Sequence, residues 1–201
     1  VIRAAESASD EPANRIDLLH WGLIPSWAKD PSMGARMINA RSESAAEKPA
    51  FRSAFKRRRC IVPATGFYEW KKTGSAKQPF FIHRTDDETI AFAGLWESWE
   101  DKRRNNGLGV VESFTILTCE PNDDLRELHD RMPVILPRDH HEAWLDPEND
   151  DAEALQEMLQ PLDDGVLDMY PVSRHVNSPK HTDAKCLEPL GDDEPPASLF
   201  G

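Results

Sequence analysis

The chain has 201 residues and a formal net charge of −12, from 36 Asp and Glu against 24 Lys and Arg. That length suits a single domain with a hydrophobic core and is short for two. No apolar run approaches the roughly 20 residues that a transmembrane helix needs, so we expect no membrane span.

The three cysteines, Cys60, Cys119 and Cys186, are widely spaced and form no Cys-x-x-Cys pair. This spacing predicts neither a disulfide framework nor a zinc cage, and we expect no cofactor and no bound metal. Residues 1–10 lack the basic and apolar regions of a secretory leader. We therefore expect a reducing, cytoplasmic location.

The charge is unevenly distributed along the chain. Residues 21–60 carry nine basic and three acidic side chains, a net +6, whereas residues 105–160 carry three basic and fourteen acidic ones, a net −11. A basic face on an acidic protein is therefore compatible with nucleic acid as a partner. For the acidic segment we consider a partner surface and simple solvation, and solvation is the default.

The first 60 residues predict short extended segments followed by helices. In chain order we expect a strand ending near Arg3, a polar acidic loop at 4–14, a strand at 16–21, and helices at 43–48 and from Pro49 onwards. Ser42 is the predicted N-cap of the first helix. In the second helix Phe51 and Phe55 are spaced i, i+4 and should stack.

Residues 60–99 alternate short apolar runs with turn residues, a pattern typical of an antiparallel meander. The predicted strands are at 61–63, 66–71, 80–83 and 89–96, followed by a charged loop at 100–106 and a strand at 114–119. Later we expect a helix from Asn122 to Leu128, helices around Trp144 and at 151–159, a strand at 166–172, and a loose acidic tail from about 192. We predict one α+β domain over residues 1–201, with a curved antiparallel β-rich core and short flanking helices.

Two short segments place polar groups among apolar ones. Asn39 and Arg41 lie at i, i+2 on a short extended piece, so their side chains should share a face. The alternative is a turn Asn and a surface Arg. Glu69 lies in the aromatic strand 66–70, either exposed at a sheet edge or held in a pocket where desolvation would raise its pKa and suit general acid or base catalysis.

A third polar cluster is the sequence His-Asp-Arg-Met-Pro at 129–133. Polar residues concentrated in a loop between apolar elements are common at functional sites, although a structural histidine is the more frequent case. Lys56 to Arg59 are either a phosphate site or a solvated helix end. Trp21 and Trp27 are either a stacking wedge for bases or core residues.

In their order along the chain, these motifs resemble the SOS response-associated peptidase (SRAP) family. The motifs are WGLIPSW at 21–27, NARSE at 39–43, CIVPA at 60–64, GFYEW at 66–70, AGLW at 93–96, HDRMP at 129–133, PVS at 171–173 and VN at 176–177. The resemblance covers residues 21–177, which is most of the chain.

The resemblance implies a protein of the DNA damage or SOS response that recognises abasic sites in single-stranded DNA and forms a covalent crosslink with them. In the family, an N-terminal cysteine forms a Schiff base with the sugar aldehyde through its α-amine, and its thiol then closes a thiazolidine. The expected partner is abasic single-stranded DNA, with the protein associated with the nucleoid when bound. Protein partners are not predicted.

Matched residue by residue, the resemblance assigns Asn39 to orienting the substrate, Glu69 to proton transfer during Schiff-base formation, and His129 to ring opening and crosslink reversal. It assigns Arg41 and Arg131 to phosphate contacts and Trp27 to stacking beside the lesion.

One feature departs from the family pattern: the family begins Met-Cys-Gly-Arg, and this segment does not occur in the 201 residues. We expect it to precede Val1, and we expect the chain as written not to form the crosslink. Two other functions are compatible with the sequence. One is a cysteine-type peptidase that acts on its own leader or on a partner, and the other is a non-catalytic single-stranded DNA-binding protein.

Overall fold

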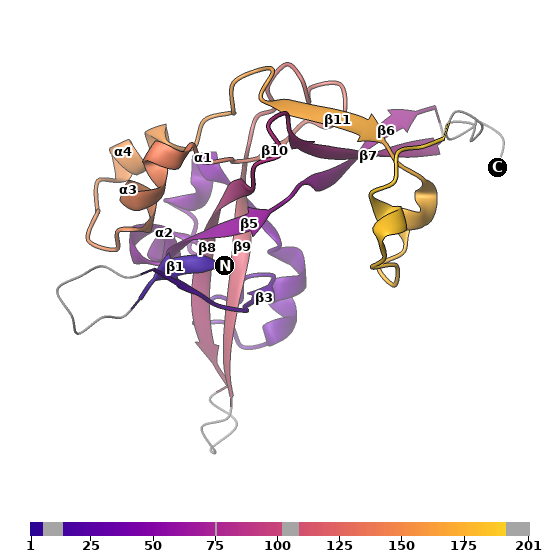
Figure 1. Cartoon of the computed structure of the whole chain (residues 1–201). Coiled ribbons are helices and arrows are strands. Elements are labelled where there is room, and N and C mark those ends of the chain that lie inside the picture. The colour runs from indigo at the N-terminus through magenta and orange to yellow at the C-terminus, as the bar shows by residue number, and fades with distance from the viewer. Residues whose placement is uncertain (6–13, 75, 102–108, 192–201) are drawn as a thin grey trace. The chain divides into compact units, whose positions relative to one another are not determined.

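Two sheets organise the computed structural model, which describes residues 1–5, 14–74, 76–101 and 109–191 (Figure 1). Each sheet belongs to one of two compact units. Unit 1 comprises Val1–Pro63, Ala91–Cys119 and Pro133–Pro161, and unit 2 comprises Ala64–Ile90, Glu120–Met132 and Leu162–Gly201. Among the described residues, no helix has both the length and the apolar character needed to cross a bilayer.

The large sheet of unit 1 has the strand order β10-β9-β8-β5-β1-β2, and β3 and β4 pair additionally with β9. Its strands are β1 (Ile2–Ala4), β2 (Asn14–Ile16), β3 (His20–Trp21), β4 (Asn39–Arg41), β5 (Arg59–Ala64), β8 (Ile90–Glu100), β9 (Val110–Cys119) and β10 (Met132–Pro133). The long strands β8 and β9 are antiparallel. The short strands β3 and β4 run parallel to β9, a pairing that the antiparallel prediction does not include.

Short helices accompany this sheet: η1 (Pro31–Arg36), α1 (Ser42–Ala45), α2 (Arg52–Arg57), η2 (Arg138–His140), α3 (His141–Leu145) and α4 (Ala152–Glu157). The indole of Trp144 is fully buried, packs edge-on against Phe55 and donates to the Cys60 carbonyl. The buried guanidinium of Arg59 donates to the carbonyls of Phe55, Lys56 and Trp144, so it joins the end of α2 to α3. Each buried carbonyl thereby keeps a partner.

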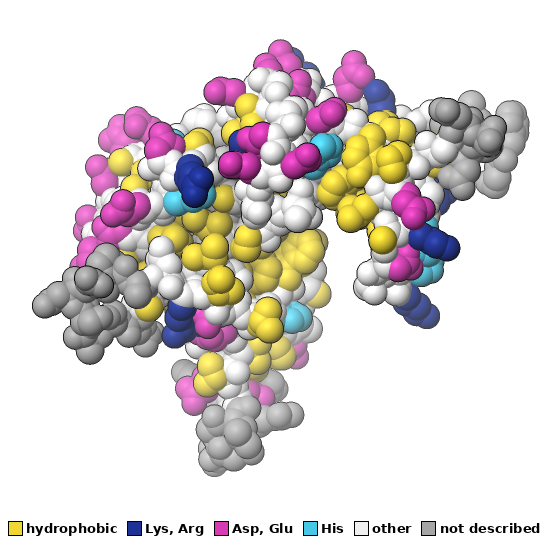
Figure 2. All heavy atoms as spheres, in the orientation of Figure 1, with side chains coloured by type: hydrophobic (Ala, Val, Ile, Leu, Met, Phe, Trp, Pro, Cys, Tyr) yellow, Lys and Arg dark blue, Asp and Glu magenta, His cyan; other side chains and the backbone are white. Residues whose placement is uncertain are grey.

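The acidic side chains of the 105–160 segment lie largely on the helical part of unit 1. In Figure 2, Asp and Glu side chains gather over α3 and α4, where Glu142, Glu148 and Glu153 are exposed. This arrangement agrees with solvation of a helical surface.

The sheet of unit 2 has three antiparallel strands in the order β11-β7-β6. They are β6 (Phe67–Thr73), β7 (Ala76–Arg84) and β11 (Leu167–Pro171), and the unit also contains η3 (Arg174–Asn177) and η4 (Ala184–Cys186). At the end of β6, Gly74 has a φ of 62°, a left-handed conformation that favours glycine in a tight hairpin. At its start, Gly66 lies so close to β7 that a Cβ would be 2.5 Å from the carbonyl oxygen of Ile82.

The α+β class and the β-rich core with short flanking helices are confirmed, and most predicted elements are present. The meander prediction is wrong, because β5 and β8 belong to the large sheet while β6 and β7 form their own sheet with β11. The predicted strand at 16–21 is divided between β2 and β3. The single domain over residues 1–201 stays a prediction.

Two helix predictions also need correction. Ser42 is the first residue of α1 and not its N-cap, a position held by Arg41. Residues 123–128 form turns instead of a helix, although Asn122 Oδ1 accepts the Leu125 amide as a capping residue does. Most of the predicted loops at 4–14 and 100–106, and the predicted tail from 192, lie outside the described residues.

Candidate active site

Glu69 is held in the middle of β6, at the register position opposite Phe80 of β7. The strand forms because 67–70 are aromatic apart from Glu69, and aromatic side chains favour a pleated, half-buried surface. All four of these side chains are half-buried. On one side the strand is anchored by the Tyr68 hydroxyl, which donates to the Cys186 carbonyl at 3.1 Å, and by the Trp70 indole, which donates to Asn177 Oδ1 at 2.8 Å.

His129 follows the turn at 123–128, whose conformation is fixed by Asn122. The Asn122 amide nitrogen donates to the Leu162 carbonyl, and its oxygen accepts the Leu125 amide. The side chains of Leu125 and Leu128 are buried beneath the turn. The exposed His129 therefore emerges from a tethered segment of unit 2.

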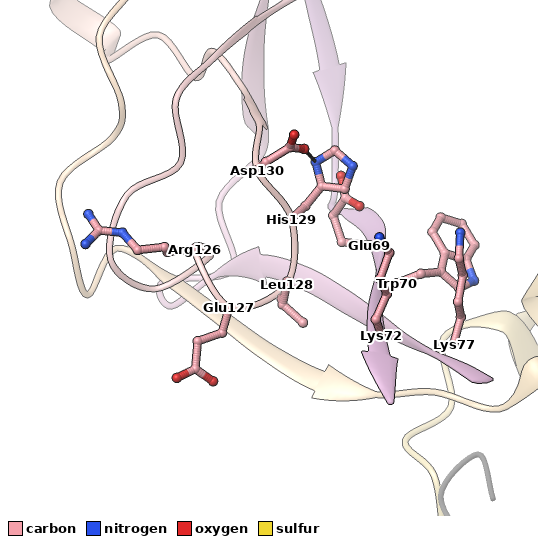
Figure 3. Close-up of a pocket in the computed structure, with 9 residues that line it drawn as sticks. All are labelled: Glu69, Trp70, Lys72, Lys77, Arg126, Glu127, Leu128, His129 and Asp130. Atoms are coloured by element: carbon pink, nitrogen blue, oxygen red, sulfur yellow. Dashed lines mark ion pairs between the residues drawn. The ribbon is translucent and has the colours of Figure 1, made fainter. Parts of the chain in front are cut away.

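Glu69 and His129 line the same cleft, which has a volume of about 580 Å³. Figure 3 shows the Glu69 carboxylate directed toward the imidazole of His129. Nine residues line the cleft: Glu69, Trp70, Lys72, Lys77, Arg126, Glu127, Leu128, His129 and Asp130. Cationic and acidic groups thus share one cavity with an indole.

The pKa of Glu69 is raised above its ordinary value. Desolvation by burial is the largest cause, and the negative charge of Asp130 acts in the same direction. The charge of His129 and the backbone amide of Trp70 favour the carboxylate and offset part of this rise. A carboxyl group whose pKa is moved toward neutrality can both donate and accept a proton, as general acid–base catalysis requires.

The imidazole of His129 has partners for both of its protonation states. Its Nδ1 accepts from the backbone amide of Arg131 at 3.1 Å when that nitrogen is unprotonated. When Nδ1 carries a proton, the Arg131 carbonyl at 3.1 Å and the Asp130 carboxylate at 3.2 Å can accept it. The ring can therefore gain or lose a proton without leaving a polar group unpaired.

The remaining predicted residues, apart from Arg131, lie in unit 1. Asn39 and Arg41 flank the buried Ala40 on β4 and are both exposed, so the predicted sharing of a face is observed. Because Trp21, Asn39 and Arg41 are opposite residues 114, 116 and 118 of β9, they follow one another along one face of the sheet. Trp21 is 51% and Trp27 56% exposed, which excludes the core alternative for both.

The predicted site residues therefore form two sets. Glu69, His129 and Arg131 lie in unit 2, and Asn39, Arg41 and Trp27 lie in unit 1. The basic run at 56–59 is structural over much of its length, because Arg59 is buried and Arg58 pairs with Glu97 at 2.8 Å.

Sequence reasoning missed Lys72, Lys77 and Asp130 as cleft residues. Lys72 and Lys77 are directly opposite each other in the β6–β7 hairpin. Pairing the chain symmetrically about Gly74 would have brought these two lysines together. For Asp130, adjacency to His129 was the available signal.

The comparisons with known proteins agree with this arrangement of motifs. The family model described as SOS response associated peptidase (SRAP) matches residues 1–179. The chain belongs to the SRAP family. Its SRAP relatives include two Bacillus subtilis proteins, abasic site processing protein YoaM, with 46% identity, and abasic site processing protein YoqW, with 44% identity. Both alignments span 181 residues and 90% of this chain, with 78% of YoaM and 79% of YoqW covered.

The fold of this SRAP protein is also found among solved structures. A crystal structure of a protein from Bacteroides thetaiotaomicron matches 94% of this chain and 80% of its own, with a TM-score of 0.80 and 30% sequence identity. The fold of the SRAP chain is therefore one that has been observed experimentally.

Proposed function

We propose that this SRAP protein recognises abasic sites in single-stranded DNA and forms a covalent DNA–protein crosslink with them. Abasic site processing is the activity in the names of its relatives YoaM and YoqW. The observation that carries the proposal is the pair Glu69 and His129 in one cleft, with the pKa of Glu69 raised by burial. This pair supplies two proton-transfer groups at a cavity lined by cations.

The proposed nucleophile is an N-terminal cysteine ahead of Val1, as the family resemblance implies. Its α-amine has an ordinary pKa of roughly 7.7–8.0, so a substantial fraction is neutral near pH 7. The amine adds to the aldehyde carbon of the ring-opened abasic sugar, and the resulting carbinolamine loses water to give a Schiff base. The thiol then adds to the imine carbon, and its proton passes to the nitrogen as the thiazolidine forms.

The cysteines within the chain do not fit this role. Cys60 is fully buried, and burial raises the pKa of its thiol to about 12, so the thiolate is scarce near neutrality. Cys119 and Cys186 are also buried. In addition, each internal nitrogen is an amide and cannot form a Schiff base.

Within this proposal Glu69 and His129 have separate tasks. Protonated Glu69 donates to the carbinolamine hydroxyl as it leaves as water, and the carboxylate then accepts the thiol proton. His129 removes the C1 hydroxyl proton of the closed sugar and returns a proton to the ring oxygen, which opens the ring to the aldehyde. The raised pKa of Glu69 supports the first task, because it increases the protonated fraction near pH 7.

Binding of the DNA strand would use cations and aromatic surfaces in both units. Trp27 has an exposed indole on which a base can stack, and the exposed Arg41 can contact a phosphate, with Asn39 orienting the sugar. In unit 2, Arg131 and the lysines 72 and 77 are the corresponding phosphate ligands. Phosphate contacts of this kind make affinity fall with added salt.

The test is a crosslinking assay with the protein bearing its natural N-terminus and an oligonucleotide with one abasic site. We expect a slower band on a denaturing gel for the single-stranded abasic substrate and none for the intact strand. Glu69→Gln should slow the reaction by about 100-fold, the lower end of the range for general acid–base groups. The matched control is Glu127→Gln, which removes an exposed carboxyl group from the same cleft.

Two results would contradict the proposal. If the protein binds the strand reversibly, with no crosslink and no preference for the lesion, it is a single-stranded DNA-binding protein. If it instead releases peptide from its own leader or a partner, with the abasic strand unchanged, it is a peptidase. Equal rates for Glu69→Gln and the Glu127→Gln control would remove Glu69 from the mechanism.

A further inference from the structure

Three chemically different side chains converge in the C-terminal part of unit 2. His175 lies in η3, Asp183 is the N-cap of η4, and Cys186 ends η4. One ligand-type atom from each, a ring nitrogen, a carboxylate oxygen and the thiol sulfur, lie within 4.8 Å of one another. Nε2 of His175 is 3.0 Å from Oδ2 of Asp183. This convergence is outside the cleft and is not used in the crosslinking chemistry.

The three side chains are held in place by their neighbours. Oδ1 of Asp183 accepts the backbone amide of Lys185 at 3.0 Å, as a helix cap does, and this leaves Oδ2 facing the imidazole. The His175 ring is stacked on the His181 ring, with 3.7 Å between centroids and 6° between planes. Nδ1 of His181 is hydrogen-bonded to the His175 carbonyl. Preorganised side chains of this kind lose little entropy on binding a ligand.

The arrangement is different from that of a catalytic triad. In a triad the acid and the nucleophile contact opposite nitrogens of the histidine. Here the Asp183 carboxylate lies at Nε2, and the Cys186 thiol donates to the His181 carbonyl at 3.6 Å. Cys186 is also only 8% exposed, which leaves little access for a substrate. Three donors directed toward a common point are instead the pattern of a metal centre.

We propose that His175, Asp183 and Cys186 bind a zinc-type divalent cation, with water as the fourth ligand. Imidazole, carboxylate and thiolate are the protein donors that zinc takes. Bonds of about 2.0–2.3 Å in a tetrahedral site place ligand atoms about 3.3–3.6 Å apart, so a shift of about 1 Å closes the present set. Binding displaces the thiol proton to solvent, and the carboxylate and thiolate then balance the charge of the ion.

The sequence did not indicate this site, because its single cysteine has no Cys-x-x-Cys partner. The ligands come instead from His-x-Asp-x-x-Cys at 181–186 together with His175, whose ring is brought over this segment by the turn between η3 and η4. The nearby Lys185 adds a positive charge that lowers the pKa of Asp183 and so favours its ionised form, the form that binds a cation. The expectation of no metal therefore rested on the spacing of cysteines alone.

A bound ion would act on the strand that carries Glu69. Tyr68 donates to the carbonyl of Cys186, and Trp70 donates to the side chain of Asn177, so the segment grips β6 on either side of Glu69. An ion joining η3 to η4 would fix these two contacts relative to each other. Its role is structural, in the sense that it supports the strand without touching the reacting atoms.

The experiment is a titration of reduced, tag-free protein with Co²⁺, which replaces zinc in such sites and is coloured. We expect one equivalent to bind and produce a thiolate-to-cobalt charge-transfer band, which Zn²⁺ then abolishes. Cys186→Ser should lose this band, whereas the control Cys119→Ser, which removes another buried cysteine, should keep it. His175→Ala and Asp183→Asn should each weaken Co²⁺ binding at least about tenfold.

A second measurement protects the test against misfolded variants. Zn²⁺ should raise the melting temperature of the parent and of Cys119→Ser, with no rise in Cys186→Ser. Absence of a charge-transfer band in the folded parent protein would overturn the proposal, as would an unchanged band in Cys186→Ser. Neither measurement involves DNA, so its result is independent of the proposed crosslinking function.

Discussion

Gly66→Ala should disturb the hairpin that carries Glu69, because no room exists for a side chain at this position. An added Cβ would lie 2.3 Å from the ring of Phe81 and 2.5 Å from the carbonyl oxygen of Ile82. The ring can rotate, but the carbonyl is part of the β7 backbone. Ordinary contact begins near 3.4 Å, so β6 and β7 must separate by roughly 0.9 Å at this point.

Overpacking of this kind costs about 1–3 kcal/mol of unfolding free energy. For a chain of this size, each kcal/mol lowers the melting temperature by about 2–4 °C. We therefore expect a decrease of roughly 2–12 °C in a thermal melt followed by circular dichroism. The displacement is propagated to Glu69 three residues later, so the crosslinking rate should also fall.

Gly191→Ala is the matched control, because a methyl group added to Gly191 would meet no atom within 4 Å and the φ of this residue is not left-handed. It should leave both the melting temperature and the crosslinking rate unchanged. If Gly66→Ala also melts with the parent protein and reacts at the same rate, then the close approach of β6 to β7 does not position the site, and the reasoning fails.

Three further predictions test other parts of the structure. Burial raises the pKa of Glu69, so its protonated form stabilises the folded chain below the unfolded pKa and this stabilisation is lost as pH rises through the folded pKa; Glu69→Gln should therefore raise the melting temperature at pH 7 and have little effect at pH 4. Arg59→Met, which leaves several buried carbonyls without donors, should lower the urea unfolding free energy by about 3 kcal/mol, and an unchanged midpoint would refute the role of this network. Arg41→Gln should reduce the salt dependence of single-stranded DNA binding by about one counterion, whereas an unchanged slope would exclude a phosphate contact.

The elements that could be predicted are those specified by local sequence. The β6–β7 hairpin follows from aromatic runs on either side of Thr73-Gly74, and α4 follows from Asp151, whose carboxylate accepts two amides of the first turn. The assignment of strands to sheets was not predicted, because it depends on contacts between distant segments. The pairing of Ile2 with Ile61, for example, joins residues that share no local signal.

The candidate site shows the same limit. Glu69 was identified as a carboxyl group among aromatic residues, but whether it faced solvent or a pocket could not be decided from its neighbours in sequence. The raised pKa comes from its burial in the fold, and His129 and Asp130 reach it from a turn about sixty residues later. The turn itself was predicted as a helix, since the capping contact of Asn122 is common to both structures.

The division of each unit among three separate stretches of sequence has a consequence for synthesis on the ribosome. Unit 1 receives its last stretch, Pro133–Pro161, only after most of the chain has been translated, and unit 2 waits for Leu162 and the residues beyond it. Neither unit can therefore be completed while its first strands leave the exit tunnel, and many native pairings must close long loops. Stable structure should consequently form late in translation, and no single proteolytic cut can release either unit intact.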